Sequence, residues 1–161
     1  MTCIGRSAVK ATILIVDDSP EIQRYLRTLL ELESYRVIVA SNGYEALEKL
    51  RRLPHADVVL LDVQMPGMDG LEVLGRMQKL CPKVRVIMCS GLNDSEKICQ
   101  ALSLGAYAYL LKPVQHLYLS AAVERCLRKV SSARPKEQRK LFVLPSPIRA
   151  EHATSLPNFK S

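Results

Sequence analysis

The sequence predicts an α/β protein in which a doubly wound, five-stranded parallel sheet carries helices on both faces. Five short apolar runs alternate with segments whose apolar residues recur at helical spacing. Hydrophobic residues make up 48% of the 161 residues, which is usual for a protein with a folded core. The length suits one ordinary domain and an extension, because domains most often contain about 100–150 residues.

The predicted strands are short runs of aliphatic and β-branched residues. They cover residues 11–16, 35–40, 57–61, 84–89 and 107–111. The third run is apolar almost throughout, as expected of a strand that helices cover on both sides. Right-handed crossovers limit the strand orders open to such a chain, and we expect 2-1-3-4-5, a common order among them.

Each strand is followed by a helix with recognisable start and end signals. Ser19 caps the first helix, and Pro20 occupies its first turn, where a missing N–H costs nothing. Capping boxes predict the next three helix starts, at Asn42 with Glu45, Asp69 with Glu72 and Asn93 with Glu96. The expected ends of these three helices are about Arg52, Leu80 and Gly105, and a last helix covers about 114–130.

The composition changes after the last helix. Residues 1–10 form an N-terminal extension, residues 11–130 the domain, and residues 131–161 a tail with four prolines. The tail holds six Lys or Arg and two Glu, so it contributes +4 to the net charge of +7. We therefore expect a flexible, solvated tail and no output domain. The apolar segment 141–144 leaves open a short docking segment within it.

Several classes of protein find no support in the sequence. The five cysteines form no C-x-x-C pair and the three histidines lack ligand spacing, so neither a disulfide framework nor a zinc site is expected. The phosphate-binding patterns G-x-x-x-x-G-K-[ST] and G-x-G-x-x-G do not occur. Neither a membrane span nor a signal peptide is recognisable. We therefore expect a cytoplasmic protein with reduced thiols and no membrane partner.

Polar side chains follow four of the predicted strands. Asp17 and Asp18 follow the first, Asp62 the third, Ser90 the fourth and Lys112 the fifth. The carboxyl ends of parallel strands share one edge of a sheet, so these groups should meet there. Clustered carboxylates require a cation, and magnesium prefers carboxylate oxygens and water. The pattern predicts a magnesium site whose aspartate can accept a phosphoryl group, with the lysine and the serine hydroxyl near its oxygens.

Four segments, in this order along the chain, resemble the receiver domains of two-component response regulators. They are the acidic pair at 17–18, LDVQMPGMDG at 61–70, MCSG at 88–91 and GAYAYLLKP at 105–113. The resemblance covers about residues 10–130 and is to single-domain, chemotaxis-regulator-like members. It implies the doubly wound, flavodoxin-like fold.

The resemblance implies a role for each matching residue. Asp62 would accept a phosphoryl group from a sensor histidine kinase or a phosphotransfer protein. Asp18 and Asp62 would bind Mg2+ (or Mn2+) directly, Asp17 would act through water, and the main-chain carbonyl of Gln64 would be a further ligand. Such a protein is a signalling phosphoacceptor and not an enzyme, although it assists its own phosphorylation and dephosphorylation.

The resemblance also implies a switch. Ser90 would be the switch hydroxyl, Gly91 beside it would leave access to the acyl phosphate, and Tyr109 would turn inward. Lys112 would be the cation of the family motif, joined to Pro113 by a cis peptide bond. The face formed by the fourth helix, fifth strand and fifth helix would then change shape. That face would control an unidentified partner protein or pair with a second copy of the chain.

Other interpretations remain open at this point. The same fold could serve as a phosphate-independent interaction module that uses the same face constitutively. A tail that contacts nucleic acid would indicate a small transcriptional regulator, but residues 131–161 lack a helix-turn-helix pattern and interleaved aromatic residues. Taken singly, Asp69 and Asp94 are typical helix caps, and Tyr109 is typical of a half-buried strand aromatic.

Overall fold

The computed structural model describes residues 8–52, 56–91, 93–128 and 143–144. The five predicted strands are present as β1 (Thr12–Val16), β2 (Arg36–Ala40), β3 (Val58–Asp62), β4 (Arg85–Ser90) and β5 (Ala108–Leu111). The helices between and after them are α1 (Pro20–Leu32), α2 (Gly43–Arg52), α3 (Gly70–Leu80), α4 (Ser95–Ser103) and α5 (His116–Leu127). The alternation of strand and helix is therefore confirmed.

The sheet is parallel, and its strands lie in the predicted order β2-β1-β3-β4-β5. A further short strand, β6 (Val143–Leu144), pairs with the outer edge of β5. The structure thus has a docked strand at two residues of a tail that we expected to be flexible. These residues are apolar, and β5 would otherwise present an unpaired edge. The rest of residues 131–161 and residues 1–7 lie outside the described residues.

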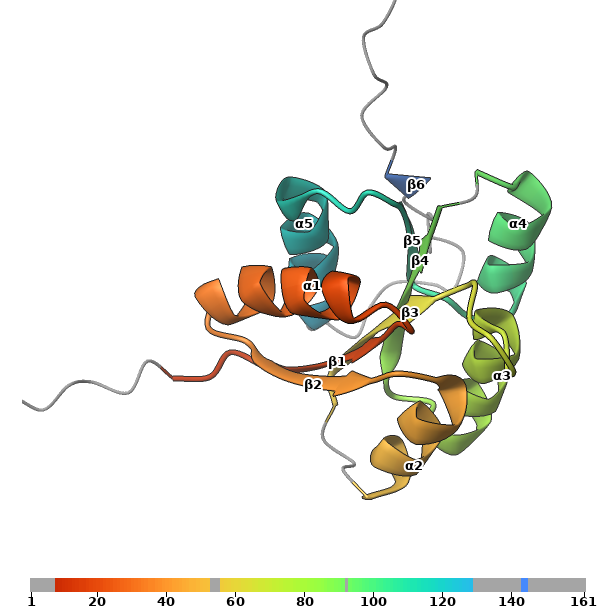
Figure 1. Cartoon of the computed structure of the whole chain (residues 1–161), viewed down its shortest axis with the longest axis horizontal. Coiled ribbons are helices and arrows are strands. Elements are labelled where there is room, and N and C mark those ends of the chain that lie inside the picture. Colours follow the sequence, from red (N-terminus) through yellow and green to blue (C-terminus); the bar gives the residue numbers. More distant parts are fainter. Residues whose placement is uncertain (1–7, 53–55, 92, 129–142, 145–161) are drawn as a thin grey trace, which may run out of the picture.

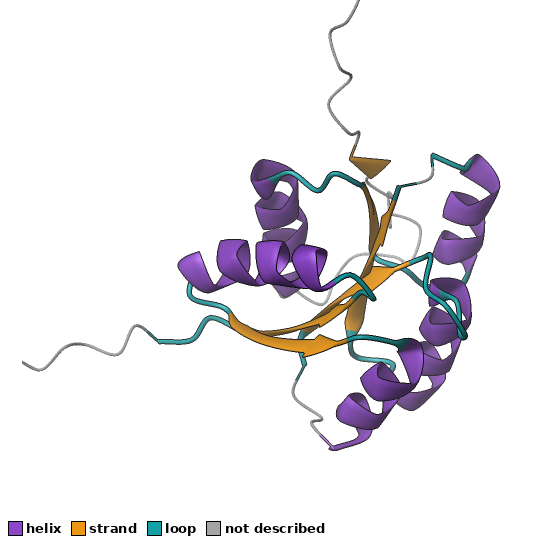
Figure 2. Ribbon diagram, in the orientation of Figure 1, coloured by secondary structure: helices purple, strands orange, loops and turns teal. Residues whose placement is uncertain are grey.

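Helices cover both faces of the sheet. Helices α1 and α5 lie on one face, and α2, α3 and α4 lie on the other (Figures 1 and 2). Alternate residues of each strand point to opposite faces, so Ile13 and Ile15 of β1 pack with α1 and α5, whereas Leu14 and Val16 pack with the other three helices. Each face therefore has its own apolar core, as a doubly wound fold requires.

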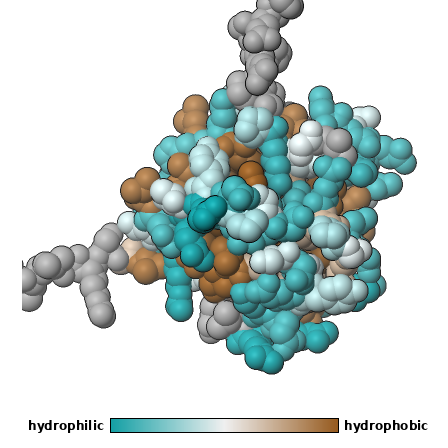
Figure 3. All heavy atoms as spheres, in the orientation of Figure 1, coloured by the Kyte–Doolittle hydropathy of each residue, from teal (hydrophilic) through white to brown (hydrophobic). Residues whose placement is uncertain are grey.

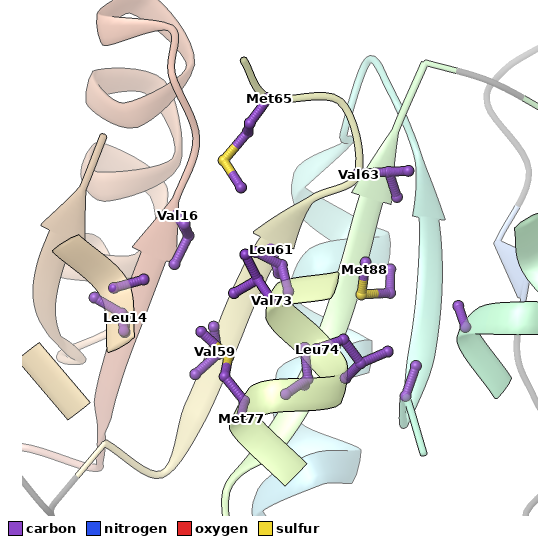
Figure 4. Packing of buried hydrophobic residues seen from close by; sticks show 14 of the residues in the cluster. Leu14, Val16, Val59, Leu61, Val63, Met65, Val73, Leu74, Met77 and Met88 are labelled. Carbon is purple, nitrogen blue, oxygen red and sulfur yellow. The ribbon is translucent and has the colours of Figure 1, made fainter. Parts of the chain in front are cut away.

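The core beneath α3 shows this packing in detail (Figure 4). Val59 and Leu61 of β3 point toward Val73, Leu74 and Met77 of α3, and all five side chains are almost completely buried. Burying aliphatic side chains of this size stabilises the fold by about 1.5–3 kcal/mol each. This packing fixes α3 against β3, the strand that ends at Asp62.

Most of the predicted helix starts are correct. Ser19 accepts a hydrogen bond from the N–H of Ile22, and Asp69 accepts one from the N–H of Glu72. The fourth cap is wrong by one residue, because Asp94 rather than Asn93 caps α4 and accepts from the N–H of Glu96. An aspartate one position later can satisfy two amides of the first turn at once.

The surface is mixed in character. On the face in view, hydrophobic side chains form separate patches among hydrophilic ones (Figure 3). None of the helices in the described part of the chain is both long and apolar enough to span a bilayer.

Candidate functional site

The strand register brings the predicted site residues to one edge of the sheet. Asp62 is the last residue of β3, and Ser90 is the last residue of β4. Leu111, which precedes Lys112, pairs with Ser90, and Val16, which precedes Asp17, pairs with Leu61. All four strand ends are thus aligned, so residues from distant parts of the chain reach the same place.

Three carboxylates cluster at this edge. One oxygen from each of Asp17, Asp18 and Asp62 lies within 4.8 Å of the other two. Asp17 and Asp62 are buried, whereas Asp18 is exposed. Hard oxygen ligands with one open side are the donor set that magnesium prefers, since Mg2+ usually keeps several waters. The residues present therefore fit this ion.

Local hydrogen bonds orient Asp17. One of its carboxylate oxygens accepts the N–H of Ser19 at 2.9 Å, in a turn that leads into the cap of α1. Its main-chain carbonyl accepts the side-chain amide of Gln23 at 2.6 Å. Gln23 belongs to no sequence motif that would have predicted this contact. The first helix of the chain thus helps to hold the acidic pair in place.

Lys112 is the cation of the cluster. Its ammonium lies 2.8 Å from one oxygen of Asp17 and 3.2 Å from one oxygen of Asp62. The backbone N–H of Lys112 donates to the carbonyl of Ser90 at 2.7 Å, which extends the pairing of β4 and β5 by one residue. The peptide bond between Lys112 and Pro113 is cis.

Burial and neighbouring charges shift the pKa values of Asp62 and Lys112. Burial raises the pKa of the Asp62 carboxyl above its ordinary value, although the ammonium of Lys112 and the N–H of Gln64 oppose the shift. Burial alone would lower the pKa of Lys112, but its hydrogen bond to Asp17 and the charge of Asp62 outweigh burial, so the pKa is raised. Lys112 therefore stays charged at neutral pH and offsets part of the carboxylate repulsion.

Two residues that follow β3, Gln64 and Gly70, contact Asp62 and help to fix its position. The N–H of Gln64 donates to a carboxylate oxygen of Asp62 at 3.1 Å. The ligand role of the Gln64 carbonyl stays a prediction. Gly70, at the start of α3, packs so closely that a Cβ there would collide with the carbonyl oxygen of Asp62. Gly70 ends the motif at residues 61–70, but the sequence pattern alone did not predict this close approach.

The predicted switch residues lie next to this cluster. Ser90 and Tyr109 are both fully buried, and Tyr109 packs with Met88 and Ala101 on the α4 side of the sheet. The half-buried alternative for Tyr109 is therefore wrong, and its ring already points inward. Burial raises the pKa of the Tyr109 hydroxyl, and a side-chain hydrogen bond with Ser90 opposes this shift. A Cβ at Gly91 would meet no described atom within 4 Å beyond the adjacent residues.

Comparison with known proteins places this geometry in a family. Residues 13–124 match the response regulator receiver domain. The chemotaxis protein CheY of Thermotoga maritima is 32% identical over 120 residues, which cover 74% of this chain and 96% of CheY. Sporulation initiation phosphotransferase F of Bacillus subtilis is 36% identical over 115 residues, which cover 71% of this chain and 92% of that protein.

Longer relatives match over part of their length. Response regulator GtcR of Aneurinibacillus migulanus is 38% identical over 129 residues, which cover 80% of this chain and 52% of GtcR. The probable transcriptional regulator ycf27 of Porphyridium aerugineum is 38% identical over 124 residues, which cover 77% of this chain and 51% of ycf27. The chain thus spans about half the length of these curated relatives.

Solved structures agree with the fold. A CheY-like receiver domain protein of Methanospirillum hungatei has a TM-score of 0.70 and 34% identity, and the match covers 73% of this chain and 93% of that one. CheY in a CheX-CheY-BeF3-Mg complex of Borrelia burgdorferi has a TM-score of 0.71 and 31% identity, with 74% and 90% covered. Receiver domains are signal-transduction modules of two-component systems and mostly not enzymes. The predicted resemblance is confirmed, and this chain belongs to the response regulator receiver domain family.

Proposed function

We propose that the chain is a phosphoacceptor receiver in which Asp62 takes a phosphoryl group from a sensor histidine kinase or a phosphotransfer protein. The observation that carries the proposal is the buried carboxylate of Asp62, which lies beside two further aspartates and 3.2 Å from the ammonium of Lys112. A lone buried carboxylate would be neutralised or paired, whereas this one has a cation on one side and a metal-type donor set on the other.

The proposed metal site uses residues already in position. Asp18 and Asp62 would bind Mg2+ or Mn2+ directly, with the carbonyl of Gln64 as a further ligand and Asp17 acting through water. When bound, the ion would neutralise charge on the phosphoryl oxygens. The exposure of Asp18 supports this assignment, because it leaves room for coordinating water and for the phosphoryl donor.

In the proposed transfer, a carboxylate oxygen of Asp62 attacks phosphorus and forms a P–O bond. The P–N bond of a phosphohistidine breaks, and the imidazole leaves with the electron pair and takes up a proton. The ammonium of Lys112 would compensate charge on one phosphoryl oxygen, and the hydroxyl of Ser90 would approach another. Gly91 would leave space for access to the acyl phosphate, which is supported by the finding that a Cβ at this position would meet no described atom within 4 Å beyond the adjacent residues.

Phosphorylation would act on two existing states of the output face. Tyr109 is already buried, and its side-chain hydrogen bond with Ser90 links it to the phosphoryl site. A phosphoryl group that draws the Ser90 hydroxyl would therefore change the population of this inward state rather than create a new one. The face of α4, β5 and α5 would transmit the change to a partner protein or to a second copy.

The domain boundaries and the cellular location that we propose are compatible with this function. We place the receiver at residues 11–130, with residues 1–10 as an N-terminal extension and residues 131–161 as a C-terminal tail. A cytoplasmic location would suit the thiols, since the four cysteines in the described ranges are free (Cys81, Cys89, Cys99 and Cys126).

Intact-mass measurement tests the proposal. With Mg2+ and a small acyl-phosphate donor, the wild-type protein should gain the mass of one phosphoryl group, and Asp62→Asn should gain none. The matched control is Asp57→Asn, because Asp57 accepts the N–H of Thr12 at the start of β1, far along the strands from the cluster. Chelation of the metal should abolish the gain in mass.

One observation favours a second candidate, a phosphate-independent interaction module. Tyr109 has no exposed surface and belongs to the core on the α4 side of the sheet, so the inward position is part of the packing of the folded chain. If metal binding is demonstrated and the mass of the wild type still does not change, this second function replaces the first.

A further inference from the structure

The outer edge of β5 carries a short strand from the C-terminal tail. β6 (Val143–Leu144) runs parallel to β5, with Val143 opposite Tyr109 and Leu144 opposite Leu110 (Figure 1). We propose that this edge is a docking site for an extended apolar segment and that Val143–Leu144 of the same chain is its resident occupant. The inference does not depend on phosphorylation of Asp62.

The composition of β5 explains why its edge needs a cover. An unpaired edge strand exposes N–H and C=O groups and is normally protected by charge, proline or a covering segment. The opposite edge strand, β2, begins with the exposed Arg36. β5 has the sequence AYLL, without charge or proline, and Ala108, Tyr109 and Leu110 are all buried. β6 therefore covers an edge that has no charged residue or proline within the strand.

The inward position of Tyr109 leaves the main chain of β5 available for pairing. Its ring packs with Met88 and Ala101 on the α4 side of the sheet and has no exposed surface. The backbone of the same residue lies opposite Val143. The docked strand therefore touches β5 at the residue that we propose as the switch aromatic.

The chain itself is suited to supply the occupant. Parallel strands require a crossover of a dozen or more residues, and residues 112–142 separate β5 from β6 in the sequence. The segment 141–144 is Leu-Phe-Val-Leu, which has strong β propensity and no charge. Pro145 follows in the sequence, and a proline cannot donate a hydrogen bond to a strand ladder.

Tethering makes this occupant difficult to displace. A segment of the same chain competes intramolecularly, at an effective concentration that can reach the millimolar range. A partner or second copy that pairs with the edge of β5 must therefore release the tail first. In this arrangement the tail covers part of the face through which the receiver would signal.

Hydrogen exchange in the full-length protein tests the docking. Val143→Pro removes a backbone N–H and should speed exchange of those β5 amides that face β6 on the order of tenfold, because alternate amides of a strand point to opposite neighbours. Ser146→Pro, which lies beyond the strand, is the matched control and should leave these amides unchanged. Equal exchange in the wild type and Val143→Pro would overturn the proposal, as would protection in the wild type that rises with protein concentration, because the occupant would then be a second copy.

Peptide binding provides an independent measurement. A fluorescent peptide with the sequence of residues 139–148 should bind full-length Val143→Pro at least about tenfold more tightly than the wild type, whose edge is already occupied. The same peptide carrying the proline at position 143 should bind neither protein. Equal binding of the first peptide to the wild type and the variant would contradict an occupied edge.

Discussion

Gly70 shows how one residue can set the position of a functional group. The first residue of α3 lies against the main chain of Asp62, and its N–H donates to the carbonyl of Val63 at 2.9 Å. A Cβ at this position would collide with the Asp62 carbonyl and would lie 2.7 Å from the α-carbon of Val63. Both are backbone atoms and cannot rotate aside. Close approach of α3 to the end of β3 therefore requires glycine.

We predict that Gly70→Ala lowers the free energy of unfolding by about 1–3 kcal/mol, because the backbone must shift to admit the methyl group. The control is Gly91→Ala, whose Cβ meets no atom within 4 Å and which should change stability by less than about 0.5 kcal/mol. Urea unfolding of both variants measures the difference. Equal stability of the two variants would contradict the close packing.

The buried cysteines make a second prediction at this scale. Burial raises the pKa of the Cys89 and Cys126 thiols to about 12. Because the thiolate is the reactive form, both should resist alkylation at pH 8 in the native protein, whereas the exposed Cys99 should react. Mass mapping after brief treatment with iodoacetamide measures this. Alkylation of Cys89 as fast as Cys99 would contradict the burial.

The same two thiols predict that the free energy of unfolding falls at high pH. Their folded pKa of about 12 exceeds the ordinary value of 9.0, so the unfolded chain loses these protons first as pH rises. The stabilising contribution is complete below pH 9 and is lost progressively toward pH 12. Urea unfolding between pH 8 and pH 11 should show declining stability, and Cys126→Ala should decline less steeply.

At the scale of elements, the helix starts differ in how they are capped. Ser19, Asp69 and Asp94 each accept a backbone N–H of the first turn that follows them. Gln115, the cap of α5, makes no such hydrogen bond. Helix α5 is instead held by packing and by hydrogen bonds to the end of α1, including the one that the Ser120 hydroxyl donates to Glu33 at 3.0 Å. Among the starts of α1, α3, α4 and α5, only that of α5 therefore lacks a hydrogen bond from a backbone N–H to the capping side chain.

We predict that Gln115→Ser stabilises the protein by about 0.5–2 kcal/mol, because the new hydroxyl can accept an N–H at the start of α5. Asp69→Ala is the opposite control and should destabilise by a similar amount, since it removes the hydrogen bond from Glu72. Thermal unfolding of both variants provides the measurement. No gain for Gln115→Ser would mean that water already satisfies this end of the helix.

At the scale of the whole molecule, the ionised carboxylate of Asp62 opposes folding. The folded pKa of Asp62 lies above its unfolded value, so the contribution of this group to stability is complete below pH 3.8 and is lost as pH rises through the folded pKa. At neutral pH the ionised carboxylate therefore destabilises the metal-free fold. Lys112 offsets only part of this effect, because it faces two carboxylates.

We predict that Asp62→Asn is more stable than the wild type at pH 7 in a metal chelator, and that this advantage shrinks toward pH 4. Magnesium should reverse the order, because a ligand at one hundred times its Kd stabilises the wild type by about 2.7 kcal/mol. Thermal unfolding with and without Mg2+ measures both effects. An equal response of the two proteins to Mg2+ would exclude Asp62 as a ligand.

Much of this architecture could be predicted because it depends on local patterns. Apolar runs, Ser19 and the 61–70 motif indicated the strands, a helix start and the acidic edge, and the parallel alternation indicated where those strand ends meet. Gln23 and Gly70 were missed, since their roles come from contacts with residues that no short pattern identifies. The predicted cap of α4 was one residue too early, because Asn93 and Asp94 are both residue types that favour the cap position.

The order of residues along the chain determined the fold class and the set of groups at the carboxyl edge, since side-chain period and strand polarity follow directly from sequence. The tertiary structure decided the rest: the inward position of Tyr109, the pairing of Lys112 with Asp17 rather than with Asp62 alone, and the docking of Val143–Leu144 on β5. Each of these depends on burial and on charges or strand edges far apart in sequence, which become neighbours only when the chain has folded.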